Sequence, residues 1–368
     1  MILRYATNDK GKTKKVAEIY TKDEHTIERH DIDSQAVFIC DKLRRSGYKS
    51  YIIGGAVRDL LLKKQPKDFD IVTDAYPAAI RKIFRHSRII GKRFKLVHVC
   101  FNENIYEVST FRSAHNIENN DNNNFGTMAE DAWRRDFTIN ALYYCPKEEQ
   151  IIDFTGGYKD LRKRVVKPII PLHRIFLEDP VRIIRAIKYS VIIDGDIPFV
   201  LKMRIKKHAK ELICCSSSRL TEEVIKIMKT GRSSRIFKKL STLGILKLIL
   251  PNIYNIQKDN YFYKSLDSFD DLIKTGKLAQ GEISYILEPL IENFMVNILN
   301  LEDYPVKTIG EVMEDVKSFL RPLTPPNRDI AEAVKKVFKR KNIKLKPAFS
   351  VRFKAVRQRQ ARSRTSGG

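Results

Sequence analysis

A pair of glycines between an apolar strand pattern and an apolar helix pattern is the feature that most restricts the fold of this chain. The segment SYIIGGAVRDLLL places Gly54 and Gly55 at this junction, and glycine lets a chain turn sharply between two such elements. Three short runs rich in β-forming residues follow it, namely DFDIVTD, KLVHVCF and NIYEVSTF. Strand and helix patterns in this order predict an α+β head with a mixed sheet over residues 34–170.

The pattern changes in the second half of the chain. Apolar residues there recur at helical spacing, as in EDPVRIIRAIKYS, LTEEVIKIMKTG and SSRIFKKLSTLGILKLILP. We therefore expect an all-α body, with one helical region over residues 171–251 and a C-terminal helical region over residues 252–345. Residues 1–33 are polar and charged, and we expect them to form a loosely attached extension that carries no chemistry.

Positive charge is concentrated at the end of the chain. The formal net charge is +25, and Lys335–Gly368 contains thirteen Lys and Arg residues and no acidic one. This concentration favours a polyanion such as RNA as the partner. Residues 346–368 have little to bury and are predicted to form a basic tail that stays disordered until it binds, although a purely solubilising tail is the alternative. The candidate RNA-binding residues are Lys335, Lys336, Lys339, Arg340, Lys341, Arg352, Lys354, Arg357 and Arg359.

Two further features concern the cellular location. The apolar stretches of the chain are shorter than a membrane-spanning helix requires. The five cysteines form no CxxC pair, which argues against a zinc site or a disulfide framework. We therefore expect a cytoplasmic protein that has no membrane partner.

Two aspartates separated by one residue, Asp68 and Asp70, are the strongest chemical signal. Side chains two apart on a strand point to the same side, so the two carboxylates could together hold Mg²⁺, which prefers hard oxygen ligands. Glu107 lies in another predicted strand and could reach the same metal ion. An isolated pair of this kind is often only a solvated turn. The nearby glycine pair adds a second feature, because backbone N–H groups at such a turn can approach a phosphate, and Arg58 would then contact the triphosphate.

Several motifs together carry a resemblance to a known family. The motifs follow one another along the chain in this order: GGAVRDLLL with KDFDIVTDA, RRDFTINALYY, FTGGYKDL, EDPVRIIRAIKYS and SRLTEEVIKIM. In this order they resemble the motifs of the bacterial class II nucleotidyltransferases, a superfamily that contains the tRNA CCA-adding enzymes and the bacterial poly(A) polymerases. The resemblance runs from about Tyr51 to Pro251. It implies a nucleotidyltransferase head followed by a helical region that recognises the nucleotide and binds RNA.

The resemblance also implies a role for each matching residue. Asp68 and Asp70 would hold Mg²⁺ and activate the 3′-hydroxyl of RNA, which attacks the α-phosphate of the substrate ATP and releases pyrophosphate. Asp136 would be a further catalytic acid, although a structural ion pair between Arg135 and Asp136 is the alternative. The nucleotide-binding residues would be Gly54, Gly55, Arg58, Arg134, Arg135, Asn140, Asp179, Arg182 and Arg185.

Asp179 and Arg182 also have a physical reason to act together. A helix that begins at Asp179 with Pro180 at its first position would place these two side chains on one face. They could then offer an acceptor and a donor to the edge of a base, as the resemblance implies. A capping residue with an intrahelical salt bridge is the structural alternative, and the two interpretations are compatible.

Within the family, two segments favour the poly(A) polymerase branch. GKRFKLVHVCFNENIYEVSTFR and RPLTPPNRDIAEAV resemble that branch more than the CCA-adding branch, and the basic tail agrees. We therefore expect a polynucleotide adenylyltransferase that acts on RNA 3′ ends in poly(A) tail synthesis, mRNA polyadenylation and RNA decay, with the RNA-decay machinery as a candidate partner. The alternatives are a CCA-adding tRNA nucleotidyltransferase and a non-catalytic RNA-binding protein on the same fold. The shared motifs do not distinguish use of ATP alone from use of CTP and ATP.

Overall fold

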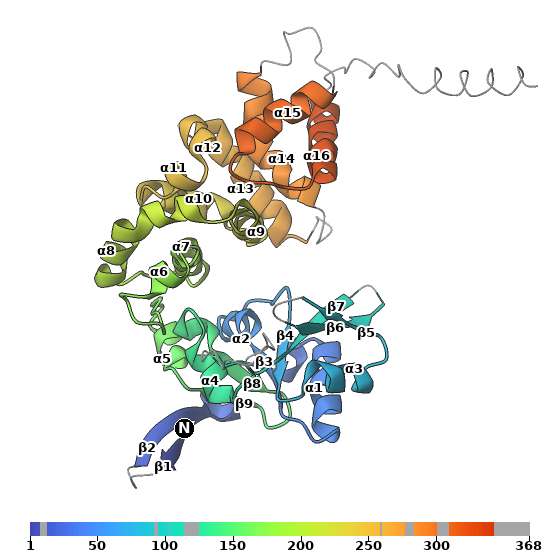
Figure 1. Ribbon diagram of the computed structural model, residues 1–368, viewed down its shortest axis with the longest axis vertical. Coiled ribbons are helices and arrows are strands. Elements are labelled where there is room, and N and C mark those ends of the chain that lie inside the picture. Colours follow the sequence, from blue (N-terminus) through green and yellow to red (C-terminus); the bar gives the residue numbers. More distant parts are fainter. Residues whose placement is uncertain are drawn as a thin grey trace, which may run out of the picture. The chain divides into compact units, whose positions relative to one another are not determined.

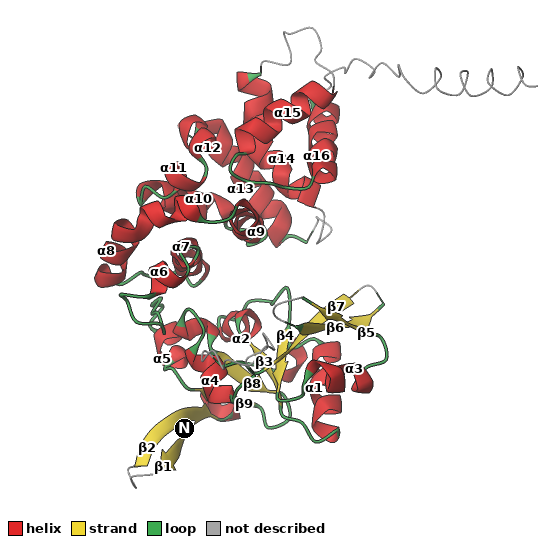
Figure 2. Ribbon diagram, in the orientation of Figure 1, coloured by secondary structure: helices red, strands yellow, loops and turns green. Residues whose placement is uncertain are grey.

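The computed structural model describes residues 1–7, 13–91, 95–102, 104–113, 125–257, 260–276, 283–299 and 309–341. The chain divides into two compact units, Met1–Glu211 and Leu212–Gly368 (Figure 1). The first unit combines a sheet with helices, and the described residues of the second unit form helices only (Figure 2). The predicted α+β head followed by a helical body is confirmed. The first unit extends to Glu211 and so contains helices that follow residue 170, where the head is predicted to end.

Nine strands of the described residues form one sheet in the order β1-β2-β9-β8-β3-β4-β7-β6-β5. Neighbouring strands run antiparallel except for β4 and β7, which run parallel, so the sheet is mixed as predicted. The strands are β1 (Ile2–Thr7), β2 (Thr13–Tyr20), β3 (Ser50–Ile53), β4 (Asp70–Thr73), β5 (Ser87–Ile90), β6 (Leu96–Phe101), β7 (Asn104–Thr110), β8 (Leu142–Cys145) and β9 (Gln150–Asp153).

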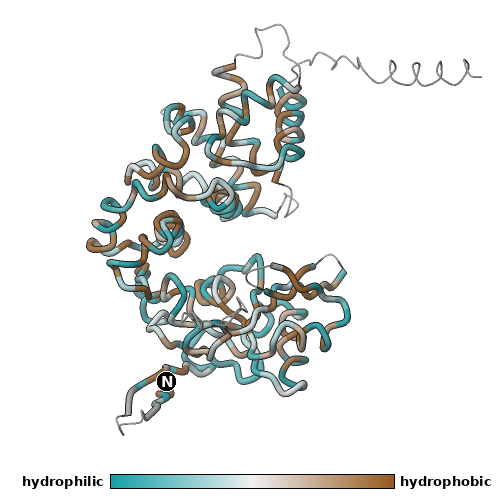
Figure 3. Tube along the Cα trace, viewed as in Figure 1, coloured by the Kyte–Doolittle hydropathy of each residue, from teal (hydrophilic) through white to brown (hydrophobic). Residues whose placement is uncertain are grey.

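Hydrophobic residues follow the strands of the head and the helix α7 (Figure 3). Tyr51, Val72 and Tyr143 from three neighbouring strands belong to one buried cluster, which also contains Phe111 and Ile152. The α-helices of the first unit are α1 (Ser34–Arg45), α2 (Gly55–Leu61), α3 (Pro77–Ile83), α4 (Met128–Trp133), α5 (Gly157–Arg162), α6 (Ile175–Glu178), α7 (Arg182–Ile192) and α8 (Phe199–His208). Short 3-10 helices are η1 (Lys22–Glu24), η2 (Arg29–Asp31), η3 (Thr138–Asn140) and η4 (Ala209–Cys214).

The expectation that residues 1–33 are loosely attached is corrected by the structure. Strand β2 pairs with β9 and so extends the sheet of the head. Ile19 and Tyr20 of this strand are buried. His25 follows the strand, and its Nε2 atom hydrogen-bonds to the backbone oxygen of Glu149 at 2.9 Å. The segment was misjudged because a strand at this position has few apolar residues, and its pairing partner lies far along the chain.

Glu18 of β2 provides a test of this attachment. Its side chain is buried and accepts hydrogen bonds from Lys15, Lys159 and Tyr20. Burial alone would raise its pKa, but these three donors outweigh burial and lower the pKa to about 2. A carboxylate with a lowered pKa stabilises the fold above its unfolded pKa, and the stabilisation is lost as the pH falls towards the folded value.

We therefore expect Glu18→Gln to lower the free energy of unfolding at pH 7, by at most about 3 kcal/mol. The difference from the wild-type chain should shrink as the pH falls from about 4.5 towards 2. Urea unfolding curves of both proteins at several pH values measure this difference. A difference that is independent of pH would contradict the assignment of Glu18 as a stabilising anion.

The second unit is held together by buried polar contacts as well as apolar packing. Asp270 accepts hydrogen bonds from the backbone N–H groups of Ser233 (2.8 Å) and Ser234 (3.0 Å), and so it caps the start of helix α10 from α13. The helices of this unit are α9 (Ser217–Met228), α10 (Ser233–Thr242), α11 (Leu246–Ile249), α12 (Pro251–Ile256), α13 (Asn260–Lys274), α14 (Ile283–Asn293), α15 (Ile309–Leu320) and α16 (Asn327–Arg340), with a π-helix, η5 (Phe294–Ile298), after α14. No helix in the described part of the chain is both long and apolar enough to cross a membrane.

Three of the predicted RNA-binding residues contact helix α14 of their own unit. Arg340 binds Glu288 and Glu292, both at 2.9 Å, and Lys341 lies 3.5 Å from Glu292. Lys336 lies over the ring of Tyr285. These side chains fasten α16 to α14, because buried carboxylates require a cationic partner. Lys335 and Lys339 are exposed. The predicted tail 346–368, which contains Arg352, Lys354, Arg357 and Arg359, lies outside the described residues.

Candidate active site

A glycine turn joins strand β3 to helix α2. Gly54 follows Ile53, the last residue of β3, and has a φ angle of +73°, which residues with a side chain rarely adopt. A Cβ atom on Gly54 would lie 3.9 Å from Nη1 of Arg135 and 3.9 Å from the backbone oxygen of Asn140. The turn therefore lies beside the segment that carries Arg135 and Asn140, although about 80 residues separate them in the sequence.

The two aspartates lie at the start of strand β4. Asp70 pairs in the sheet with Ile53, so the aspartates and the glycine turn lie at the same end of two paired strands. Asp68 and Asp70 are exposed, whereas Phe69 between them is buried. This alternation agrees with the prediction that both carboxylates face one side.

Glu107, the third predicted ligand of the metal ion, has a partner of its own in the structure. Strand β7 pairs with β4 so that Val108 lies beside Ile71, which brings Glu107 level with Asp70. The carboxylate of Glu107, however, lies 3.6 Å from Nε2 of His98 on β6. In the part of the chain that the structure describes, no three His, Cys, Asp or Glu side chains are gathered closely enough to hold a metal ion. Asp68 and Asp70 without a third carboxylate would still suit Mg²⁺, because it often binds through one or two carboxylates plus substrate phosphates.

Arg58, which is predicted to contact the triphosphate, is buried and pairs with two side chains of the head. Its Nη2 atom lies 2.8 Å from Asp59, and Nη1 donates to Oδ1 of Asn140 at 2.7 Å. Arg58 therefore orients the amide of Asn140. The other half of this amide, Nδ2, is buried and has no hydrogen-bond partner among the described residues. Because buried donors are normally paired, this unused N–H group indicates a place for an acceptor from a ligand.

Asp136 pairs with Arg185, and the alternative ion pair between Arg135 and Asp136 does not form. Oδ2 of Asp136 accepts from Nε of Arg185 at 2.6 Å, and Oδ1 accepts the backbone N–H of Phe137 at 2.8 Å. Asp136 is only 8% exposed. Its carboxylate therefore orients Arg185 of helix α7 against the head.

The ring of Tyr189 is surrounded by cationic side chains. The guanidinium carbons of Arg58 and Arg185 lie 5.3 and 5.5 Å from the ring centroid, and Nζ of Lys188 lies 5.0 Å from it. Cations are attracted to the face of an aromatic ring. Tyr189 therefore helps to gather positive charge from α2 and α7 close to Asn140.

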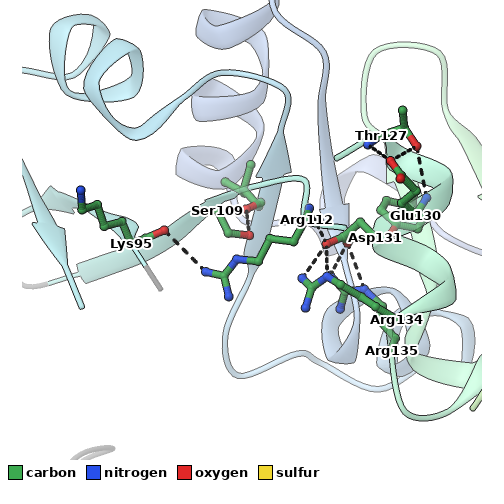
Figure 4. A network of polar contacts seen from close by, with 10 residues as sticks. Lys95, Ser109, Arg112, Thr127, Glu130, Asp131, Arg134 and Arg135 are labelled. Carbon is green, nitrogen blue, oxygen red and sulfur yellow. Dashed lines mark hydrogen bonds and ion pairs between the residues drawn. The ribbon is translucent and has the colours of Figure 1, made fainter. Parts of the chain in front are cut away.

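Asp131 of helix α4 is the centre of a polar network (Figure 4). Its fully buried carboxylate accepts hydrogen bonds from the side chains of Arg134, Arg135 and Tyr143 and from the backbone N–H of Arg112. Burial disfavours the charged carboxylate, but the charges of Arg135 and Arg134 hold the pKa of Asp131 below its usual range. The carboxylate thus remains ionised and binds both arginines of the RRD motif.

The EDPVR segment forms a turn between two helices. Helix α6 ends at Glu178, and α7 begins at Arg182 rather than at Asp179 as predicted. Oδ1 of Asp179 accepts the backbone N–H of Val181 at 3.2 Å, which is a contact within the turn, because the residue that precedes α7 is Val181 and no side chain caps this helix. Arg182 lies 3.2 Å from Glu178 and 3.9 Å from Asp179. Asp179 and Arg182 are therefore close together, whereas the capping contact of the structural alternative does not form.

Gly157 allows helix α5 to pack against η3, the 3-10 helix that carries Asn140. A Cβ atom on Gly157 would lie only 2.0 Å from the backbone oxygen of Thr138. We expect Gly157→Ala to destabilise the head by about 3 kcal/mol, because the added methyl group forces the two helices apart.

The neighbouring Gly156 provides a matched control. It has a φ angle of +83°, and a Cβ atom there would meet no atom within 4 Å. Gly156→Asn should lower the free energy of unfolding much less than Gly157→Ala does, since asparagine tolerates this conformation. Thermal unfolding of the two variants measures the difference. Equal losses for both would show that the contact with Thr138 does not limit the packing.

Sequence reasoning missed Asp131, Lys188 and Tyr189. Asp131 lies three and four residues before Arg134 and Arg135, and in a helix this spacing brings opposite charges together. The same rule would have found Asp131 beforehand. Nothing comparable marks Lys188 or Tyr189, because the contact of Tyr189 with Arg58 depends on the packing of α7 against the head.

Comparisons with known proteins agree with this arrangement. The family described as "Poly A polymerase head domain" matches residues 50–167, and that described as "Probable RNA and SrmB- binding site of polymerase A" matches residues 197–256. Poly(A) polymerase I of Salmonella typhimurium is 36% identical over 264 residues, which are 68% of this chain and 56% of that protein. The CCA-adding enzyme of Lactobacillus delbrueckii subsp. bulgaricus is 32% identical over 219 residues, which are 58% of this chain and 55% of that protein.

The chain thus spans about half the length of the curated relatives that it matches. Among solved structures, the CCA-adding enzyme of Bacillus stearothermophilus in complex with CTP superimposes with a TM-score of 0.55. It is 24% identical, and the match covers 88% of this chain and 86% of that one. At this identity the likeness concerns the fold.

Proposed function

Because the chain belongs to the nucleotidyltransferase family of poly(A) polymerases and CCA-adding enzymes, we propose that it is a template-independent polynucleotide adenylyltransferase. Such an enzyme adds AMP from ATP to RNA 3′ ends. The observation that carries the proposal is the pairing of Asp70 with Ile53, which brings two exposed carboxylates to the glycine turn at Gly54. The choice of AMP is supported by the 36% identity to a poly(A) polymerase, against 32% to a CCA-adding enzyme.

The residues of the head suit this reaction. The 3′-hydroxyl of RNA attacks the α-phosphate of ATP, a new phosphodiester bond forms, and pyrophosphate leaves. Mg²⁺ held by Asp68 and Asp70 would lower the pKa of the hydroxyl and offset the charge on pyrophosphate. The backbone N–H groups at the Gly54 turn and the unused amide donor of Asn140 would bind oxygen atoms of the nucleotide.

Recognition of the base is proposed for the EDPVR turn. Asp179 offers a carboxylate oxygen and Arg182 offers guanidinium N–H groups, and the two lie 3.9 Å apart. Arg185, held by Asp136, continues the same helix towards the head. The acceptor and donor together could distinguish adenine from other bases without a nucleic-acid template.

RNA is the proposed partner, and the basic tail is proposed to bind its phosphates. Truncation after Lys346 removes six Lys and Arg residues. We expect it to weaken RNA binding and processivity. The slope of the logarithm of the binding constant against the logarithm of the salt concentration should become shallower by about 0.7 for each contact to single-stranded RNA that is lost. Single-nucleotide addition on saturating primer should be unchanged. Loss of that addition would mean that the tail belongs to the catalytic fold.

The proposed function is tested by incorporation of each labelled nucleotide, with Mg²⁺, onto two primers. One primer is a generic RNA oligomer and the other is a transfer RNA that lacks its terminal CCA. We expect long tails made from ATP alone on the generic primer. Omission of Mg²⁺ with added chelator is the control and should abolish addition.

The same experiment separates the two alternatives. A CCA-adding enzyme would add two cytidines and one adenosine to the transfer RNA only and then stop. This kind of enzyme is the second candidate because the chain is 32% identical to one of its members. Binding of both RNAs without any addition would instead indicate a non-catalytic RNA-binding protein on the same fold.

A further inference from the structure

Asp131 binds two arginines in the same way, one on each carboxylate oxygen (Figure 4). Arg134 donates to Oδ1 from Nε (2.9 Å) and Nη2 (2.5 Å). Arg135 donates to Oδ2 from Nε (3.3 Å) and Nη2 (2.9 Å). The carboxylate therefore uses one edge of each guanidinium group and leaves Nη1 of both groups for other partners.

The remaining amino group of Arg135 faces the glycine turn. Its Nη1 atom lies 3.9 Å from the position that a Cβ atom on Gly54 would take. Because Gly54 has no side chain, this space is open to a ligand that reaches the turn. The Nη1 group can donate to a phosphate or a hydroxyl oxygen, as guanidinium groups commonly do.

Positive charge is crowded at this place, and the carboxylate offsets it. Burial and the nearby charge of Arg134 lower the pKa of Arg112, whose backbone N–H also donates to Asp131. Without an anion among them, the guanidinium groups of Arg134 and Arg135 would repel each other. Tyr143 of strand β8 donates its hydroxyl to Oδ2 at 2.8 Å and keeps the carboxylate from rotating.

We propose that Asp131 is a positioning residue for the nucleotide site, which acts by holding the Nε and Nη2 edge of Arg135 so that Nη1 faces the Gly54 turn. The inference rests on the proposed function, since it states how one ligand-binding group of that site is held in place. Asp131 is fully buried and does not contact the nucleotide itself. Its effect arises because a side chain held in its binding orientation loses less entropy when the ligand arrives.

The test is the dissociation constant for ATP in the absence of RNA, measured by equilibrium dialysis with the full chain. Asp131→Asn keeps the shape of the side chain but places an amide N–H group against the donors of one arginine. We expect the dissociation constant to rise about 10- to 100-fold. The KM for ATP should rise by a similar factor, while kcat at saturating ATP should change less than about threefold.

Coupling to Arg135 distinguishes positioning from a general loss of structure. Arg135→Ala should weaken ATP binding to a similar extent, and the double variant should be no weaker than the single variants. Asp270→Asn is the matched control, because Asp270 is also a buried carboxylate with several donors but lies in the second unit. It should lower the melting temperature and leave ATP binding unchanged.

Three outcomes would overturn the inference. One is an unchanged dissociation constant in Asp131→Asn, and another is additive losses in the double variant. The third concerns Arg135→Lys, which is used if Asp131→Asn shows no cooperative melting. Lysine keeps the charge but cannot give two donors to Oδ2 from a planar edge, so ATP binding should weaken, and wild-type binding would contradict the inference.

Failure of the proposed function is separable from these results. If the wild-type chain binds ATP but transfers no nucleotide to RNA, the proposed function is wrong and the binding comparison still tests Asp131. If the wild-type chain does not bind ATP, both are wrong.

Discussion

Replacement of Asp68 or Asp70 by alanine is expected to reduce nucleotide incorporation about 1,000-fold or more. Both carboxylates are exposed at the start of β4, beside the glycine turn. Each substitution would remove one of the two candidate ligands of Mg²⁺, and stabilisation by a metal ion supplies several kcal/mol of the barrier reduction in phosphoryl transfer. Single-turnover incorporation of labelled ATP onto a generic RNA primer measures the effect.

RNA binding should be retained in both variants, because both aspartates are exposed and alanine introduces no larger or charged group. Asp74 provides the matched control, since it lies just beyond the other end of the same strand and accepts the backbone N–H of Lys49 at 2.7 Å. Asp74→Asn retains an acceptor for this contact and should keep near-wild-type incorporation. If Asp68→Ala and Asp70→Ala behave like Asp74→Asn, the reaction is carried by other residues or the protein only binds RNA.

Arg182→Ala is expected to reduce discrimination between ATP and the other nucleotides about 10- to 100-fold. A pair of hydrogen bonds to the edge of a base contributes roughly 1–3 kcal/mol of discrimination. The guanidinium group of Arg182 is held by the backbone oxygen of Ile175 at 3.0 Å and by Glu178 at 3.2 Å. It is therefore preorganised next to Asp179. The ratio of kcat/KM for ATP to that for CTP, GTP and UTP measures the discrimination.

The control for this prediction is Arg174, which also binds Glu178, at 2.6 Å. Its side chain is 62% exposed, compared with 17% for Arg182. Arg174→Ala removes one ion pair of the same glutamate and should leave discrimination unchanged. A loss of discrimination in both variants would mean that Glu178, rather than the guanidinium group of Arg182, governs recognition of the base.

Local patterns in the sequence were enough to predict several elements of the head. The segment SYIIGGAVRDLLL forms strand β3 (Ser50–Ile53), a glycine turn and helix α2 (Gly55–Leu61), as its pattern indicates. Asp68 and Asp70 are both exposed around a buried phenylalanine, as period-two alternation requires. These features depend on residues that are neighbours in the chain and on the steric limits of the backbone, so a short segment already contains the information.

Helix ends were predicted less well for a related reason. The EDPVR segment was expected to begin a helix at Asp179, but α7 begins at Arg182. Pro180 has no N–H group, and Asp179 has an extended backbone with φ −156°. Whether such a turn continues into the helix depends on the position of α6, to which Arg182 is joined through Ile175.

The partners of the long charged side chains were decided by the tertiary structure. Glu107 meets His98 through the register of β6 and β7, and Arg340 meets Glu288 across a separation of 52 residues. The attachment of residues 1–33 likewise depends on the pairing of β2 with β9. A run of basic residues predicts that their side chains bind anionic groups, but it does not identify which anionic group lies close enough to bind.

The sequence by itself therefore determined the fold class, the order of the motifs and the residue types at the candidate site. The tertiary structure alone decided that Asp136 binds Arg185, that Arg58 binds Asn140, and that Asn140 keeps an unused buried donor. The physical reason is the difference in range. Periodicity, turn formation and the local pairing of Asp131 with Arg134 and Arg135 act over a few residues, whereas the contacts of Asp136 and Asn140 depend on sheet register and helix packing, which are set by the burial of the whole core.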